Sequence, residues 1–194
     1  MAGTINEFLS SFTTDVARQA RFDVQIPVPL SLVQYVTSAK NLSFRCETSN
    51  LPGRSMETTF KKMGSAPQEK FPYHTMYNEV NMNFIVSDDM NEKIFFDAWM
   101  DLINPSTTYN FQYKANYAVD ISINQYDLTN KLTYSCLLQE AFPLQIGELD
   151  LDWTAEGFHK LAVVFTYKQW SNNMVTSIRN NLLSTAITSL TSSL

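Results

Sequence analysis

Apolar and polar residues recur at two spacings along this chain, and these spacings predict most of its elements. A period of two predicts β-strands, because successive side chains of a strand point to opposite faces. Segments with this period are 21–28, 41–49, 79–87, 107–113, 117–126 and 131–142. A spacing of three to four predicts a short amphipathic helix or arm over 4–19 and a helix over 92–103, which Asn104-Pro105 ends.

The stretch 143–170 predicts a β-hairpin with one apolar side. Its first run places Leu149, Leu151 and Trp153 on one face, opposite Glu148, Asp150 and Asp152. A turn containing Gly157 follows, and the second run alternates from Leu161 to Tyr167. Trp99, Trp153 and Trp170 all lie in phase with apolar stripes, which predicts core positions for the three indoles.

The order of elements predicts a mostly β fold, with sandwich-like or barrel-like antiparallel sheets and one flanking α-helix. Strands do not alternate regularly with helices, so a parallel βαβ architecture is not expected. Three segments are expected: an N-terminal arm or short helix over 1–20, a β domain over 21–170 and a C-terminal extension over 171–194. The extension is rich in Ser, Thr and Asn, and its apolar residues recur near helical spacing.

Residues 53–72 are polar and irregular, and they predict a long loop with a short strand at 58–62. Loops of this length in a compact domain are usually functional or disordered. Lys61 and Lys62 have a simpler interpretation as a solvated pair than as an anion site.

Charge excludes a basic nucleic-acid-binding surface for the chain as a whole. The net charge is −5 with a pI near 5.0. Residues 71–194 contain thirteen acidic and six basic residues, whereas residues 1–70 contain six acidic and eight basic ones. An acidic half favours repulsion of a phosphate backbone.

Residue patterns for catalysis or cofactor binding are missing from the sequence, so no enzyme activity, cofactor or metal is expected. There is no glycine-rich phosphate loop, and the two histidines, His74 and His159, are far apart. Cys46 and Cys136 lie on strand-like runs and are interpreted as buried free thiols. The alternation of Glu148, Asp150 and Asp152 favours a charged, solvated sheet face over a cation site. Neither a signal peptide nor a membrane span is indicated.

An ordered set of motifs over residues 21–170 resembles the tail tube proteins of T4-like contractile phages. The set comprises Phe22-x-Val24-x-Ile26, Phe44-x-Cys46, Leu51-Pro52-Gly53, the strand 80–86, Asp88-Asp89, Phe96-x-x-Trp99, the stretch 147–153 and Tyr167-x-x-Trp170. The N-terminal arm and the last 24 residues depart from that pattern.

The resemblance implies a non-enzymatic structural subunit with two packed β-sheets and a flanking helix. It implies hexameric rings that stack inside a contractile sheath and conduct DNA without binding it specifically. The implied partners are further copies of the chain and the sheath, baseplate and tail terminator proteins. The implied location is the virion tail, after assembly in the host cytoplasm.

Two sets of site residues follow as hypotheses. Residues Arg54, Glu57, Lys61, Lys62 and Gln68 are expected to contact the next ring, because they belong to a long segment with few apolar anchors. Glu148, Asp150 and Asp152 are candidates for an acidic lumen wall. The alternatives are a baseplate-proximal tube initiator, the tube of a related injection or secretion system and, in another class, a β-sandwich module that binds a ligand.

Overall fold

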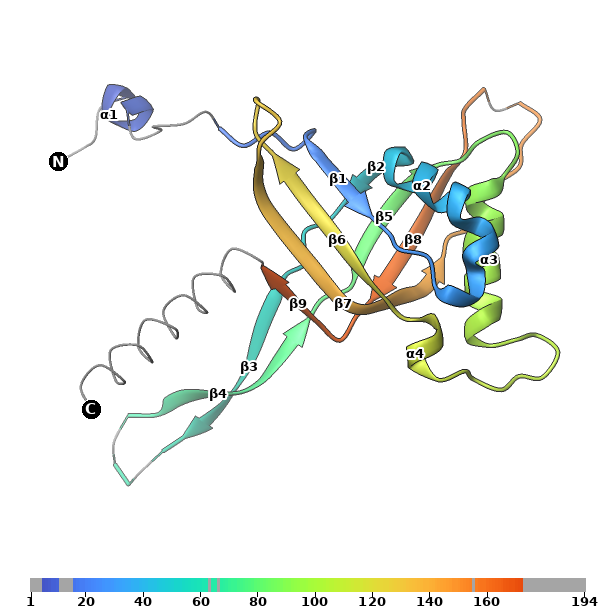
Figure 1. The fold of residues 1–194 in the computed structure, drawn as a ribbon. Helices are drawn as coiled ribbons and strands as arrows, with labels where there is room; N and C mark the ends of the chain where they lie inside the picture. The colour runs from blue at the N-terminus through green and yellow to red at the C-terminus, as the bar shows by residue number, and fades with distance from the viewer. Residues whose placement is uncertain (1–4, 11–15, 63, 66, 155, 173–194) are drawn as a thin grey trace, which may run out of the picture.

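One long strand, β7 (Leu132–Ile146), joins the two halves of a curved antiparallel sheet (Figure 1). Its first part pairs with β6 and β9, and its last part pairs with β8. The strand order is β1-β6-β7-β8-β5-β2, and the strands at the two ends, β1 and β2, approach each other. The sheet is therefore barrel-like and antiparallel, as the sequence pattern predicted.

The computed structural model describes residues 5–10, 16–62, 64–65, 67–154 and 156–172. The expected helix in the C-terminal extension lies almost wholly outside these residues. The other strands and the helices are α1 (Ile5–Ser10), β1 (Phe22–Gln25), the 3-10 helix η1 (Leu30–Tyr35), α2 (Val36–Arg45), β2 (Cys46–Ser49), β3 (Arg54–Lys61), β4 (Glu69–Tyr77), β5 (Val80–Ile85), α3 (Asn91–Ile103), α4 (Lys114–Tyr117), β6 (Val119–Tyr126), β8 (Lys160–Thr166) and β9 (Gln169–Asn172).

The bend in β7 occurs at Glu140, which has a left-handed backbone with φ of 53°. The register against β6 shifts at this point, so the strand has a β-bulge. The backbone N–H of Glu140 donates to Asp120 at 2.9 Å, and its carboxylate pairs with Lys114 at 3.0 Å and Lys168 at 2.7 Å. These contacts hold a conformation that is uncommon for a residue with a Cβ.

The core lies between the sheet and α3. Phe95, Phe96 and Trp99 of α3 are fully buried. Phe96 contacts Phe84 of β5 and Phe165 of β8, and Trp99 also contacts Phe165. The Trp99 indole N–H donates to a backbone carbonyl at 2.9 Å, so this large side chain is buried without an unsatisfied donor. The predicted helix over 92–103 and the core position of Trp99 are confirmed.

One predicted strand, over 107–113, is wrong, and another, over 41–49, is correct only in its second half, where β2 forms. Residues 41–45 belong to α2, where Leu42 is buried but Phe44 is 90% exposed, because residues two apart on a helix point in nearly opposite directions. Residues 107–113 form a loop, whose aromatic side chains are solvent-exposed rather than paired.

The cysteines are free thiols, as expected, although only Cys136 is fully buried and Cys46 is half-buried. Burial raises the pKa of Cys46 to about 12 and that of Cys136 to about 11, so both remain protonated thiols. Within the described residues, no helix has both the length and the apolar character needed to cross a bilayer.

Candidate assembly surfaces

A two-stranded sheet, β3–β4, projects from the barrel as a separate arm (Figure 1). Arg54 pairs with Tyr77 at its base, and Lys61 pairs with Glu69 near its tip. The prediction of an irregular loop over 53–72 is therefore wrong, although the short strand predicted at 58–62 lies largely within β3. Almost every residue of both strands is exposed, so no buried face imposes the alternation by which a strand is recognised in sequence.

This arm, residues 54–77, is named here the basic hairpin. It contains four basic residues and two acidic residues. It also exposes large apolar side chains, including Met56 at 54%, Phe60 at 57% and Tyr73 at 66%. An isolated two-stranded hairpin is only marginally stable in water. An exposed apolar arm of this kind is typical of a segment that packs on a partner.

The predicted ring-contact residues all belong to this hairpin or its turn. Arg54 begins β3, and the Glu57 carboxylate accepts a hydrogen bond from the Tyr73 hydroxyl at 2.5 Å. Lys61 ends β3, and Lys62 and Gln68 lie in the turn, all with exposed side chains. The structure thus brings the five residues together on one projecting element.

Residues 147–159, which connect β7 to β8, are named here the acidic loop. They contain Glu148, Asp150, Asp152 and Glu156 and no Lys or Arg. The strand predicted over 147–153 is wrong, since the structure has no strand there and β7 ends at Ile146. The hairpin predicted over 143–170 does form, but its strands are β7 and β8.

The alternation from Glu148 to Trp153 does not separate an apolar face from an acidic one. Leu151 is 86% exposed and Trp153 is 105% exposed, so the predicted core position of Trp153 is also wrong. Trp170, in contrast, is half-buried and packs against the core. The backbone N–H and hydroxyl of Thr154 each donate to Asp152 at 2.9 Å and lower the pKa of that carboxyl.

Gly147 lies in close contact with β8 where the acidic loop leaves β7. Its N–H donates to the Ala162 carbonyl at 2.6 Å, and a Cβ at position 147 would lie 3.1 Å from that oxygen and 3.2 Å from the Ala162 Cβ. A side chain at position 147 would need Ala162 to move by a few tenths of an ångström, so glycine suits this close approach of the two backbones.

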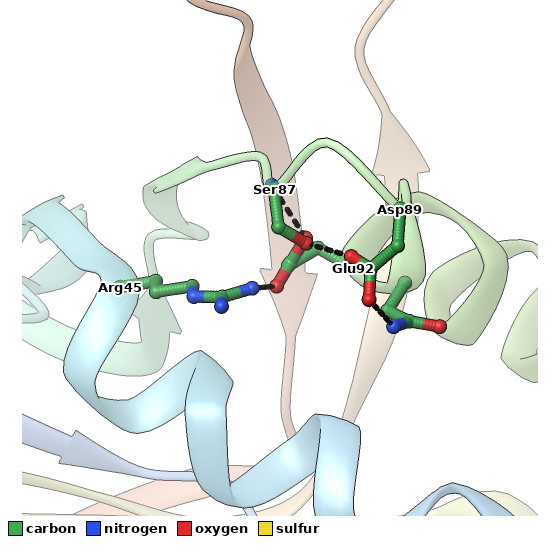
Figure 2. Close-up of polar contacts among 5 residues, drawn as sticks. Arg45, Ser87, Asp89 and Glu92 are labelled. Atoms are coloured by element: carbon green, nitrogen blue, oxygen red, sulfur yellow. Dashed lines mark hydrogen bonds and ion pairs between the residues drawn. The ribbon is translucent and has the colours of Figure 1, made fainter.

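A buried carboxylate, Glu92, fixes the end of the barrel next to the acidic loop (Figure 2). It accepts hydrogen bonds from the Ser87 backbone N–H at 2.9 Å and the Ser87 hydroxyl at 2.7 Å, and it pairs with Arg45. The neighbouring Val86 N–H donates to the His159 carbonyl at 3.0 Å. The network therefore links α2, the start of α3 and the end of the acidic loop.

Burial raises the pKa of Glu92, but the hydrogen bonds from Ser87 and Arg45 outweigh this effect and leave the pKa below its usual value. Stability from a depressed carboxyl pKa is present above the unfolded-state value, about 4.3, and is lost as pH falls through the folded-state value. Glu92→Gln is expected to lower the free energy of unfolding by about 2 kcal/mol at pH 7 and by less below pH 4. Urea unfolding at both pH values measures this.

Asp97→Asn is the matched control for that prediction. Asp97 is an exposed partner of Lys93 on the same helix, and such surface pairs contribute about 0.5 kcal/mol or less. A loss of stability in Glu92→Gln that is independent of pH would contradict the role assigned to its charge.

A third exposed surface was not recognised in the sequence. Tyr109, Phe111 and Tyr113, in the loop between α3 and α4, are 74%, 77% and 84% exposed. Tyr109 has a φ of 54°, a left-handed conformation in a turn closed by its N–H to the Pro105 carbonyl at 2.9 Å. Their alternation matches the period of a strand, and sequence alone does not distinguish such an aromatic-rich loop from a strand.

Comparison with protein families identifies the kind of molecule that has these surfaces. Residues 17–173 match the model of a family described as phage tail tube protein. The chain belongs to the phage tail tube protein family. The match covers the whole barrel and the basic hairpin, and it ends one residue after β9. No curated protein matches the sequence.

Solved structures share the fold of this tail tube protein at low sequence identity. A chain of the anti-feeding prophage baseplate has a TM-score of 0.59 and 13% identity, over 82% of this chain and 97% of that one. A chain of the anti-feeding prophage cap has a TM-score of 0.58 and 14% identity, over 83% and 93%. A chain of the sheath-tube complex of the PVC extracellular contractile injection system, in its extended state, has a TM-score of 0.56 and 13% identity, over 89% of this chain and 99% of that one.

Proposed function

We propose that this chain is the repeating subunit of a tail tube, forming stacked hexameric rings that conduct DNA inside a contractile sheath. The observation that carries the proposal is the family match over residues 17–173. Its place is the virion tail, after assembly in the host cytoplasm. Its partners are other copies of itself and the sheath, baseplate and terminator proteins. Its role is structural and not enzymatic.

Open strand edges support ring formation. Among the described residues, β1 pairs only with β6, β2 only with β5, and β9 only with β7. An unpaired edge exposes backbone donors and acceptors that a neighbouring copy can satisfy. A ring in which neighbouring subunits pair their edges would remove these edges in the manner of a closed barrel.

A bore wall that does not hold DNA is the second part of the proposal. On the solvent side of β5 and β8, the exposed residues Asn81 and Ala162 and the half-buried Asn83 are uncharged, and the charge of Lys160 is paired with Glu47 at 2.8 Å. Neutralising phosphates with Lys or Arg would release counterions and create affinity. Preformed tubes should therefore not bind duplex DNA at physiological salt, and tight binding in a filter or mobility assay would contradict this.

An end ring, such as a baseplate-proximal initiator, is the second candidate. The similar structures include a chain from a baseplate and a chain from a tube-terminating cap, and this supports the end ring as an alternative. A repeating subunit should form tubes of many rings on its own, whereas an end ring should stop at one or two. A β-sandwich module that binds a ligand would instead remain a monomer or dimer.

Negative-stain imaging of the purified chain, together with its elution volume, tests these alternatives. Rings and extended tubes are expected. A homogeneous monomer at high concentration would contradict the proposed function.

A further inference from the structure

The basic hairpin and the acidic loop lie at opposite ends of the same part of the sheet (Figure 1). The hairpin ends at Tyr77 and leads into β5 at Val80. The other end of β5, Ile85, pairs with Lys160, where the acidic loop ends. The six residues of β5 separate the two surfaces by about 20 Å at roughly 3.3 Å per residue. The hairpin of a subunit therefore points away from that subunit's own acidic loop.

The tip of the basic hairpin combines positive charge with exposed rings. The tip contains three basic residues, Lys61, Lys62 and Lys70, and one acidic residue, Glu69. Phe60 and Phe71 are 57% and 45% exposed, and the Lys70 ammonium lies 5.3 Å from the Phe60 ring centroid. The surface is suited to a partner that is both apolar and acidic.

The acidic loop has that complementary character. Its four carboxylates are exposed, and no basic residue of the loop offsets them. Leu151, Trp153 and Phe158 expose 86%, 105% and 63% of their side chains, so the loop also offers apolar area. Tryptophan is one of the residue types enriched among the residues that contribute most to binding at protein interfaces.

We propose that the tip of the basic hairpin docks on the acidic loop of a second copy of this chain in the adjacent ring. The inference rests on the proposed function, since it needs rings that stack. A contact between two different surfaces at opposite ends of a subunit is heterologous and does not close on itself, so it generates an open stack. It gives Glu148, Asp150 and Asp152 a position at the junction between rings.

Opposite charge on the two surfaces gives the contact a direction and a salt dependence. Two hairpins or two acidic loops repel each other, so rings stack head to tail in one orientation. Because the charges are exposed, screening over a Debye length of about 8 Å in physiological salt weakens their attraction. Tube elongation should slow as salt rises, while the apolar contacts retain part of the affinity.

Charge reversal tests the proposal. Lys61→Glu with Lys62→Glu, and separately Glu148→Lys with Asp150→Lys, should each reduce the sedimentable tube fraction about tenfold at low salt, and the four changes combined should restore it. All four side chains are exposed, so the fold should be retained, as far-UV circular dichroism will show. Lys40→Glu with Lys131→Glu is the control, with the same charge change on exposed residues elsewhere.

The outcomes separate this inference from the proposed function. If both charge-reversal variants form tubes as fully as the wild type, the docking contact is overturned but the tube function is not. A combined variant that assembles no better than the separate reversals would also overturn the docking contact. A wild-type chain that forms neither rings nor tubes would instead count against the proposed function.

Discussion

Trp99→Ala is expected to lower the free energy of unfolding by about 3–5 kcal/mol, the range for truncating a large buried aromatic residue. Trp99 is fully buried, and its ring packs against Phe95 at 5.5 Å and Phe165 at 6.3 Å between centroids. The change leaves a cavity between α3 and the sheet. Because domains are typically stable by only about 5–15 kcal/mol, the variant should be close to unfolded at 37 °C.

Trp153→Ala is the matched control, since it removes the same atoms from a fully exposed position. Its free energy of unfolding should change by about 0.5 kcal/mol or less. Urea unfolding should be followed at concentrations where the subunit is not assembled, because assembly adds stability by mass action. Equal losses for the two variants would show that α3 does not form the core as described.

Excision of the basic hairpin is expected to abolish stacking while leaving the subunit folded. A smaller cut, in which a Gly-Ser linker replaces residues 57–68, would remove most of β3 but keep β4. That cut would leave β4 without its partner strand. Replacing residues 57–74 with Asn-Gly removes both strands together and closes a short turn on the Met56–Thr75 pair.

The expected result is a monomer or single ring whose thermal unfolding is close to that of the wild type, because the hairpin contributes none of the buried core. Electron microscopy measures whether rings stack, and a thermal melt measures the stability of the subunit. Full-length tubes from the excised variant would show that another element stacks the rings.

Sequence patterns predicted those elements whose side chains are divided between a core and solvent. β5 is an example, with Val80, Met82 and Phe84 buried and the residues between them not. The stripe of α3 is another, because its apolar residues follow the helical period. A barrel with a helix against it could therefore be predicted from period and order alone.

The predictions failed where burial on one side does not govern the pattern. The basic hairpin is exposed on both faces, so its strands have no alternation to detect. The acidic loop alternates without being a strand, and the exposure of Trp153 shows that the alternation does not separate buried from exposed faces. In 41–45, two apolar residues of a helix happened to match a period of two.

The candidate site could be predicted only in part for the same reason. Segment length and the two lysines singled out the segment that contains Lys61 and Lys62, which the structure shows as a projecting hairpin, and its contact with the next ring stays a prediction. That the acidic loop and the hairpin lie at opposite ends of β5 depends on strand pairing between residues far apart in the sequence. No local pattern contains that information, and the exposed aromatic loop at Tyr109 likewise became evident only from side-chain exposure.

Cryo-electron microscopy of tubes assembled from the purified chain tests most directly the claim that the subunits form six-membered rings stacked head to tail. We expect six copies per ring and all rings in one orientation. Each basic hairpin should contact a copy in the next ring, and the bore should not be lined by Lys and Arg. Particles without ring symmetry, or rings that alternate in orientation, would contradict this claim.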